Sequence, residues 1–450
     1  MQGNPSENQF LRYVLPSMLA MLLSGFYAIV DGFFVGHTLG DTGLAAINIA
    51  WPIASFLLAS GTGIGAGGSV VMTTRLGEGK PGKSRQALGN TLFVLIVFSA
   101  VMTVCLLLFY RPILQFLGAE GELLSAAAEY TRIVALGSAC QILGTGLVPL
   151  LRNKGRTISA MAAMVCGLVT NIILDALFMM VFHWGMFGAA FATVTAQALV
   201  AVLSLFMLFR KKEDRLGRRD LLPHGKTIAR LVKIGLSPFG MTFAPSVIII
   251  LANWQCLAYG GNRVVAAYAV LMYFVASVQL LLQGVGEGVQ PLLSYFSGAG
   301  KPGSVHRLLR KSFVLVLALS GILCAAAIVF RDTIPAIFGS SGETAALVSG
   351  ALLIAAFSFP MTGITRLASS FFYAVQKTRD SAFIIYADPL VLTPLFLYLL
   401  PLNFGVTGIW LSIPAAQGVL AGAAGILLAV YFRRHRKMVP DDQHNGGIIG

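Results

Sequence analysis

Long apolar blocks, separated by short polar gaps, run through almost all of this 450-residue chain. The blocks are roughly 20–30 residues long, which is enough for an α-helix to cross a hydrocarbon core of about 30 Å. One stretch, residues 42–74, carries no charge at all. Charged residues make up 11% of the chain, against about 25% in soluble domains. Because a backbone in lipid must satisfy its own hydrogen bonds, the sequence predicts an all-α integral membrane protein.

Twelve membrane-spanning helices are expected from these blocks. Their approximate bounds are 10–36, 46–74, 88–110, 122–150, 157–182, 186–209, 231–257, 264–291, 309–330, 345–373, 381–402 and 405–432. Of the 32 Lys and Arg residues, 27 fall on the side that holds both termini and the even-numbered connections. Only Arg111, Arg263 and Arg331 fall on the other side. The positive-inside rule therefore predicts that both termini are cytoplasmic. The net charge of +14 then reflects topology and lipid headgroups, and no nucleic-acid partner is expected.

The chain contains one six-helix unit twice. The loop "LGEGKPGKSRQALGN", from Leu76, resembles "SGAGKPGSVHRLLRK", which begins 221 residues later. Six is an even number, so both copies have the same orientation, as in secondary transporters that bind cargo between two such halves. We expect two pseudo-symmetric lobes in a parallel repeat. The predicted division is an N-terminal lobe at 1–209, a basic cytoplasmic linker at 210–230, a C-terminal lobe at 231–432 and a disordered cytoplasmic tail at 433–450.

The first of these loops also matches a nucleotide-binding pattern by its letters. "GEGKPGKS" fits G-x-x-x-x-G-K-[ST], the P-loop signature. It follows a membrane span instead of a β-strand, and the second copy has Ser304 and Val305 in place of Lys83 and Ser84. We therefore expect a basic turn that does not bind ATP. The five cysteines are scattered through apolar blocks, a spacing that predicts neither a disulfide framework nor a metal motif.

Four acidic residues lie within the predicted spans: Asp31, Asp175, Glu287 and Asp388. A charge in the bilayer costs about 2.5–3.5 kcal/mol on insertion scales, so each acid is a candidate functional group. Tyr27 precedes Asp31 by one helical turn, and Asn171 precedes Asp175 by one turn. Each pair therefore shares a helix face. Two carboxylates with amide and hydroxyl oxygens suit Na⁺, or can share a proton.

The repeat separates these acids from the common scaffold. Asp31 aligns with Ala252, and the second half has no carboxylate equivalent to Asp175. A purely structural acid would be expected in both copies, so we predict that Asp31 and Asp175 serve ion coupling.

The second half carries the other two acids. Glu287 replaces Ala66 of the first copy and is predicted to form a second proton or cation-substrate site, or an ion pair with Arg366. Asp388 either has a function of its own, reaches the cytoplasmic interface or caps a broken helix. Pro16 lies in the first span, where a proline can kink the helix and make it a coupling element.

Several stretches together resemble the MATE (multidrug and toxic compound extrusion) family, in particular its MepA-like bacterial branch. They are "VDGFFVGHTLGDTGLAA" from Val30, the loop "RLGEGKPGKSRQALGN", "TNIILDALFM" from Thr170, "GMFGAAFATVTAQ" from Gly185, "GVQPLLSY" from Gly288 and "FGVTGIWLSIP" from Phe404. The resemblance covers nearly the whole chain. It implies two six-helix lobes around a central cavity, and secondary antiport of organic cations out of the cell against Na⁺ or H⁺.

The resemblance also implies site residues. The family's cation site matches Asp31, Asn171, Asp175 and Thr193, with Tyr27 and Tyr130 as hydrogen-bonding neighbours that line the cavity. Its bending first helix matches Pro16. Two positions depart from the family pattern. Glu287 stands where MepA-like sequences usually have an uncharged polar residue, and Gln417 stands where many members carry an acid. We therefore expect a second-lobe site at Glu287 and Arg366 that the family resemblance does not imply.

Other functions are less compatible with the sequence. A flippase of lipid-linked precursors in the same superfamily would usually line its cavity with cations, whereas the predicted spans hold two arginines, Arg132 and Arg366, against four acids. A membrane enzyme would need a carboxylate or histidine cluster in a sizeable loop, so no enzymatic activity is expected. We expect a multi-pass monomer in the bacterial inner membrane that handles cationic small molecules, contacts lipid and needs no cofactor beyond Na⁺.

Overall fold

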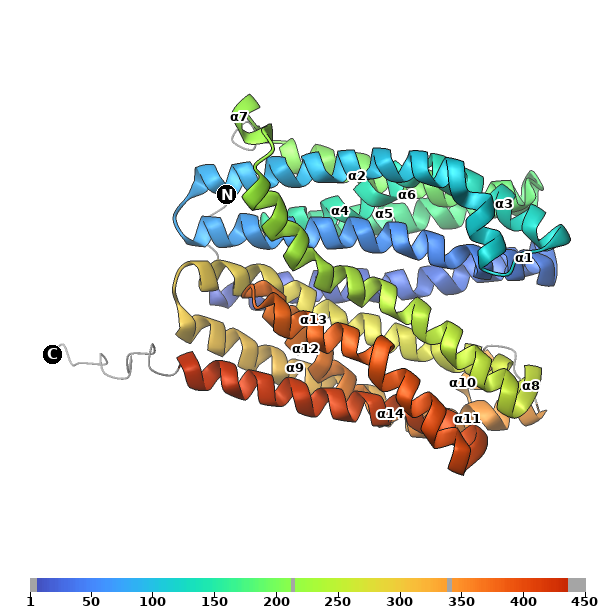
Figure 1. The fold of residues 1–450 in the computed structure, drawn as a ribbon. Helices are drawn as coiled ribbons and strands as arrows, with labels where there is room; N and C mark the ends of the chain where they lie inside the picture. Colours follow the sequence, from blue (N-terminus) through green and yellow to red (C-terminus); the bar gives the residue numbers. More distant parts are fainter. Residues whose placement is uncertain (1–5, 212–214, 338–341, 436–450) are drawn as a thin grey trace.

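The structure is a computed structural model that describes residues 6–211, 215–337 and 342–435, without the side chains of residues 26–29, 31–33, 36, 41, 42, 262, 337 and 435. Every regular element in these ranges is a helix (Figure 1). The first half comprises η1 (Glu7–Gln9), α1 (Phe10–Gly77), α2 (Pro81–Phe116), α3 (Gly121–Leu136), α4 (Ser138–Asn153), α5 (Thr157–Asp175), the π-helix η2 (Ala176–Val181) and α6 (Gly185–Phe209). The second comprises α7 (Arg218–Leu221), α8 (Gly225–Gly298), α9 (Pro302–Val329), α10 (Ile334–Ile337), α11 (Gly342–Ala356), α12 (Ser358–Ala374), α13 (Thr378–Ala387), the π-helix η4 (Asp388–Leu392) and α14 (Thr393–His435).

Three of the long elements are each two helices joined without a loop. The joints are Gly40 in α1, Gly261 in α8 and Gly405 in α14, with φ values of 62°, 63° and 55°. Glycine adopts positive φ at little cost, so the chain turns back there within one residue. The pairs α3–α4 and α11–α12 bend by 57° and 51°.

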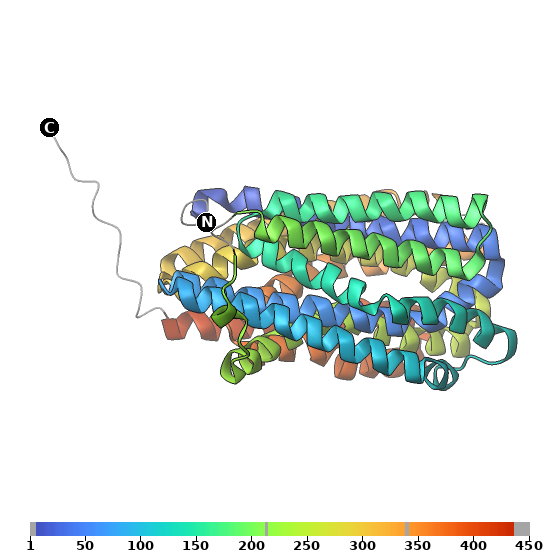
Figure 2. The same cartoon turned by 90° about the horizontal axis from the view of Figure 1, so that it is seen from above.

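The helices confirm the predicted fold class. Eight of the described helices are long and apolar enough to cross a membrane, and counting each bent pair as one span gives ten. The part of α1 before Gly40 adds an eleventh span. Dividing the last long helix at Gly405 into two spans adds the twelfth, which gives twelve spans in two lobes. Figure 2 shows the helices running side by side along one axis.

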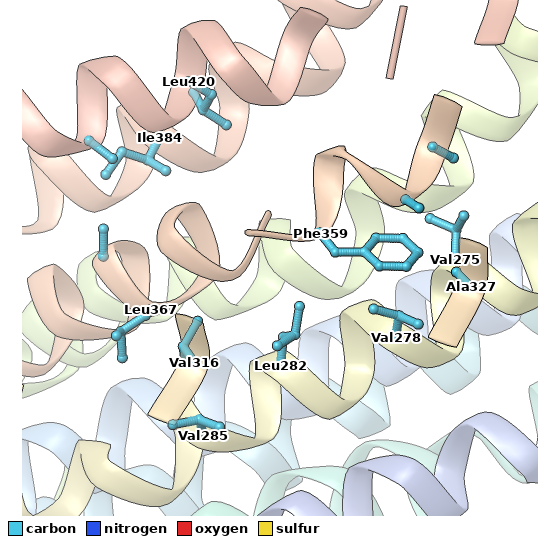
Figure 3. Packing of buried hydrophobic residues seen from close by; sticks show 14 of the residues in the cluster. Val275, Val278, Leu282, Val285, Val316, Ala327, Phe359, Leu367, Ile384 and Leu420 are labelled. Carbon is cyan, nitrogen blue, oxygen red and sulfur yellow. The ribbon is translucent and has the colours of Figure 1, made fainter. Parts of the chain in front are cut away.

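Each lobe has its own buried apolar cluster, and the first helix of each half helps to build the other lobe. The second-lobe cluster, part of which is shown in Figure 3, includes Phe10 and Val14 at the start of α1. The first-lobe cluster includes Leu231 and Ile234 near the start of α8. The start of each half's first helix therefore packs into the other lobe, whereas its later part, with Val35 in α1 and Cys256 in α8, returns to its own cluster. The two helices meet at the lobe boundary, where α1 packs along α8 (Figure 1).

The glycines shared by the two copies lie where these helices touch. Two glycine triplets correspond at the repeat offset of 221 residues: Gly63, Gly65 and Gly67 in the first copy, and Gly284, Gly286 and Gly288 in the second. A Cβ on the outer glycines of each triplet would collide with backbone of the other half. These contacts join Gly63 to Gly235, Gly67 to Leu231, Gly284 to Met18 and Gly288 to Val14. The middle glycines, Gly65 and Gly286, face Gly146 and Ser370 of their own lobes. The repeat in the sequence therefore marks a close, pseudo-symmetric contact between the lobes.

One end of the bundle carries the turns after α1 and α8, the helix α7 and the last residues of α14 (Figure 1). We call it the basic end, because Lys80, Arg219 and Lys301 lie in these segments. In the P-loop-like turn, the carboxylate of Glu78 accepts hydrogen bonds from Arg75 (2.8 Å) and Lys80 (2.9 Å). Burial alone would raise the pKa of Glu78, but these two cations outweigh it and lower the pKa.

Candidate ion and cargo sites

Asn171 and Asp175 form a buried polar face near the end of α5. Their exposed fractions are 1% and 0%, and they lie one helical turn apart. Neither the nitrogen nor the oxygen of the Asn171 amide has a hydrogen-bond partner among the described residues. Leaving buried polar groups unpaired costs about 1–3 kcal/mol each. The face is therefore suited to a ligand or ion that pairs with these atoms.

The helix changes its winding immediately after Asp175. The next six residues form the π-helix η2, in which the amide of Phe182 donates to the carbonyl of Leu177, five residues earlier. Single π-turns inside helices occur frequently at functional sites. The extra residue in this turn changes the direction in which side chains after Asp175 point.

The other predicted members of the first-lobe site lie on helices around α5: α1 and α6 pack against α5, and α3 packs against both of them. Thr193 is half-buried on α6, and Tyr130 is 6% exposed on α3. α6 contacts both α3 and α5, and α1 contacts both as well. The side chains of Asp31 and Tyr27, on α1, lie outside the described residues.

Pro16 lies in the part of α1 that packs against the second lobe, and the backbone stays helical through it. A proline leaves the carbonyl four residues earlier without its usual donor. That carbonyl belongs to Arg12, and the hydroxyl of Thr157 donates to it at 3.0 Å. Thr157 is the first residue of α5. The helix that carries Asp175 at one end therefore holds α1 beside Pro16 at the other.

The second lobe contains a partly open cavity of about 70 Å³, whose mainly apolar wall carries a few polar groups. It lies among the apolar residues of Figure 3, including Val275, Ile384 and Leu420. The charged and amide residues on its wall are Gln279, Arg366, Asp388 and Gln417.

Asp388 opens the π-helix η4 and is held by two neutral donors. The Thr393 hydroxyl donates to one carboxylate oxygen at 2.6 Å, and the Gln417 amide donates to the other at 2.7 Å. Thr365 in turn donates to the Gln417 oxygen at 3.1 Å. Asp388 thus lies inside the lobe, in a network that reaches α12 and α14.

Glu287 pairs with Arg152 across the lobe boundary, not with Arg366 as the sequence suggested. The Arg152 guanidinium lies 2.6 Å from the Glu287 carboxylate, and the two side chains are only 5% and 12% exposed. The amide of Gln283 donates to the second carboxylate oxygen at 2.8 Å. Arg366 instead donates to the carbonyl of Met241 (3.3 Å) and to Gln279 (3.2 Å). The two proposed members of the second-lobe site are therefore engaged with different partners.

A buried amide pair extends this contact between the lobes. Asn153 donates to Gln290 at 2.8 Å, and Gln290 donates back at 3.2 Å. On the first-lobe side Thr73 donates to Asn153 at 2.9 Å, and on the second-lobe side Gln290 donates to Ser294 at 2.8 Å. We call Arg152, Asn153, Glu287 and Gln290 the interlobe latch. It holds the lobes together in the half of the bundle nearer the basic end.

The sequence did not reveal the latch. The predicted fourth span stops at residue 150 and leaves Arg152 and Asn153 in the connection after it, but α4 continues to Asn153 and buries both. One signal would have extended the helix correctly. Gly155, with φ of 78°, stands just past its end, and glycine is the usual residue there.

Comparison with known proteins agrees with this fold. A family model described as MatE matches residues 16–177 and 239–399, one segment in each half. The multidrug export protein MepA of Staphylococcus haemolyticus is 26% identical over 430 residues, which cover 95% of this chain and 94% of that protein. MepA of Staphylococcus aureus (strain MSSA476) is 25% identical over 441 residues, covering 97% and 96%.

Solved structures show the same architecture. An outward-facing multidrug resistance MATE family transporter of the MOP superfamily matches with a TM-score of 0.91 at 20% identity, covering 97% of this chain and 98% of that one. A MOP superfamily transporter from Pyrococcus furiosus, described by the reverse polarity of its binding pocket, matches at 0.90 and 21% identity, covering 97% of each chain. Since the family model matches most of both halves, this protein belongs to the MatE family of membrane transporters.

Proposed function

We propose that this protein is a secondary antiporter of the bacterial inner membrane that exports lipophilic organic cations in exchange for Na⁺ or H⁺. The observation that carries the proposal is the buried face of Asn171 and Asp175, with an amide that lacks partners among the described residues. Asp31, on a helix that packs against α5, completes the coupling site with Thr193, Tyr27 and Tyr130. The names of the MepA relatives, multidrug export proteins, support this assignment.

The charge distribution supports a cytoplasmic location of the basic end and of both termini. In that orientation the interlobe latch closes the boundary between the lobes on the cytoplasmic side. Cargo can enter from the cytoplasm only after the latch opens. Alternating access then requires breaking the Arg152–Glu287 pair and the Asn153–Gln290 pair in every cycle.

Coupling is carried by α5 in this scheme. A proton or Na⁺ from outside binds at Asp31 and Asp175 and changes the charge of the buried face. The adjustment of α5 reaches α1 through the Thr157–Arg12 hydrogen bond, which lies one turn from Pro16. α1 repacks around the proline, cargo leaves outward, and the lobes reset. A single chain contains both lobes, so a monomer is sufficient.

Ethidium efflux in proteoliposomes tests the proposal, with Na⁺ and pH gradients imposed separately. At least one gradient is expected to drive efflux, and Asp31→Asn and Asp175→Asn are each expected to abolish it without loss of expression. Asp332→Asn is the matched control, because Asp332 is an exposed acid whose side chain is 75% exposed. Full gradient-driven transport by Asp31→Asn, or efflux that responds to neither gradient, would contradict the proposal.

A further inference from the structure

Arg366 is a guanidinium inside the second lobe that has no carboxylate in direct contact. Its two hydrogen bonds go to the Met241 carbonyl and to the Gln279 amide oxygen. Among the described residues, none forms an ion pair with it. A guanidinium carries five N–H donors, so donors remain beyond these two hydrogen bonds, and Arg366 lines the cavity. A charged residue at membrane depth is a functional candidate by default.

The same cavity presents one negative charge. Asp388 lines it together with Arg366, and its two hydrogen bonds come from the neutral groups of Thr393 and Gln417. The two opposite charges therefore share a space without contacting each other. A lone cation in this space would be repelled by Arg366, and a lone anion by Asp388. A ligand that carries both charges satisfies both residues.

The volume restricts the ligand further. Drug-sized pockets occupy about 300–1,000 Å³, whereas this cavity measures about 70 Å³. Such a space holds a few waters or a small polar group. The positive and negative charges of the ligand must therefore lie within a few bonds of each other.

We propose that this cavity binds an ammonium carboxylate group, with the carboxylate on the Arg366 guanidinium and the ammonium on Asp388. Arginine binds carboxylates in a bidentate geometry, which gives orientation as well as strength. The Thr393 hydroxyl and the Gln417 amide hold Asp388 in place, and Thr365 in turn donates to the Gln417 oxygen. The ligand is either a free small amino acid or the charged head of a larger amphoteric compound. This inference extends beyond cation export and does not depend on ion coupling.

Equilibrium binding of radiolabelled L-alanine to the purified full-length protein tests the proposal without any gradient. Unlabelled alanine is expected to displace the label, whereas alanine methyl ester, which lacks the carboxylate, and N-acetylalanine, which lacks the ammonium, are not. If L-tryptophan displaces the label, the site accepts the charged head of a larger compound. If L-tryptophan does not displace it, the site accepts only a free small amino acid. Absence of saturable alanine binding, or displacement by the ester as effective as by alanine, overturns the proposal.

Variants assign the binding to the two charges. Arg366→Gln and Asp388→Asn are each expected to weaken alanine binding at least about tenfold, or 1.4 kcal/mol. Arg132→Gln is the matched control, because it removes an exposed arginine from α3 of the other lobe. Unchanged affinity in a folded Arg366→Gln protein contradicts the assignment. If that variant does not fold, displacement by alanine, its methyl ester and N-acetylalanine on the unaltered protein still tests whether both charges of the ligand are needed. Ethidium efflux, measured in parallel, reports separately on the proposed antiport.

Discussion

The two lobes share a backbone device but surround it with different chemistry. In both, the fifth spanning helix of the half contains a π-turn, η2 after α5 in the first lobe and η4 after α13 in the second. In the first lobe the acid before the turn, Asp175, lies beside an amide without a described partner. In the second lobe Asp388, at the start of the turn, is held by Thr393 and Gln417. The π-turns do not lie at equivalent positions, because at the repeat offset η2 falls on residues 397–402, beyond η4. The lobes therefore distort the same spanning helix at different points and surround the distortion with different side chains.

The boundary between the lobes shows the same division. Its glycine contacts are pseudo-symmetric, since each triplet meets the first helix of the other half. The ion pair between Arg152 and Glu287 is not pseudo-symmetric. At the repeat offset Glu287 replaces Ala66 and Arg152 corresponds to Tyr373, so the charged pair has no counterpart at the equivalent position. Close approach of the lobes is therefore a property of the repeat, and the latch is an addition to it.

The largest expected effect comes from breaking the latch. Arg152→Met leaves the Glu287 carboxylate buried without its partner, which typically costs about 3–5 kcal/mol. Thermal and chemical unfolding in detergent should show this loss. The double variant Arg152→Met/Glu287→Met should recover most of it, because apolar pairs replace buried ion pairs well. Arg366→Met should cost less, since no directly paired carboxylate is left behind. Equal losses in the two arginine variants would contradict the distinction between them.

The acids of the two lobes should differ almost as strongly in transport. Asp175→Asn is expected to lower gradient-driven ethidium efflux at least about 100-fold, or 2.7 kcal/mol, because it removes the charge that the ion neutralises. Asp388→Asn should change efflux less than about threefold, because the Asn side chain can keep one of the two hydrogen bonds. The measurement is the initial rate in proteoliposomes at equal protein density. A larger loss in Asp388→Asn would place coupling in the second lobe instead.

The features that could be predicted from the sequence are local or repeated. The length of the apolar blocks predicts the twelve spans, and the loop repeated 221 residues later predicts the two-lobe register. Asn171 and Asp175 were found because they lie one turn apart on one face. The inference that both acids serve coupling stays a prediction, since the Asp31 side chain lies outside the described residues.

The features that could not be predicted depend on distant partners. Arg152 and Glu287 are 135 residues apart and lie in different lobes, and a single sequence does not encode which helices face each other. Asp388 and Gln417 are 29 residues apart, on consecutive helices whose rotation no periodicity fixes. The π-turns also escaped prediction, because one extra residue in a turn hardly alters an apolar pattern in which nearly every position is hydrophobic.

The symmetry of the glycine contacts can be tested with equivalent substitutions. Gly67→Ala and Gly288→Ala each place a Cβ against backbone of the other lobe, and overpacking of this kind typically costs about 1–3 kcal/mol. The two variants should lose similar stability in thermal unfolding. Gly82→Ala is the control, because a Cβ there meets no atom within 4 Å. A loss confined to one of the two equivalent positions would show that the boundary is asymmetric in packing as well as in charge.

The smallest effect is expected from a second ion pair between the halves, which is exposed where the latch is buried. Glu7 accepts two hydrogen bonds from Arg307 at 2.8 and 2.9 Å, and these lower the pKa of Glu7 from 4.5 to about 2. A carboxylate whose pKa falls on folding stabilises the protein above pH 4.5, and this contribution disappears as the pH falls toward 2. Because the Arg307 side chain is 60% exposed, the pair contributes less than about 1 kcal/mol. Glu7→Gln should therefore lower the unfolding temperature slightly at pH 6 and not at pH 2, whereas Glu343→Gln, in the exposed pair with Arg263, should not reproduce this pH dependence. A Glu7→Gln loss at pH 6 as large as that of Arg152→Met would mean that burial does not set the strength of the contacts between the lobes.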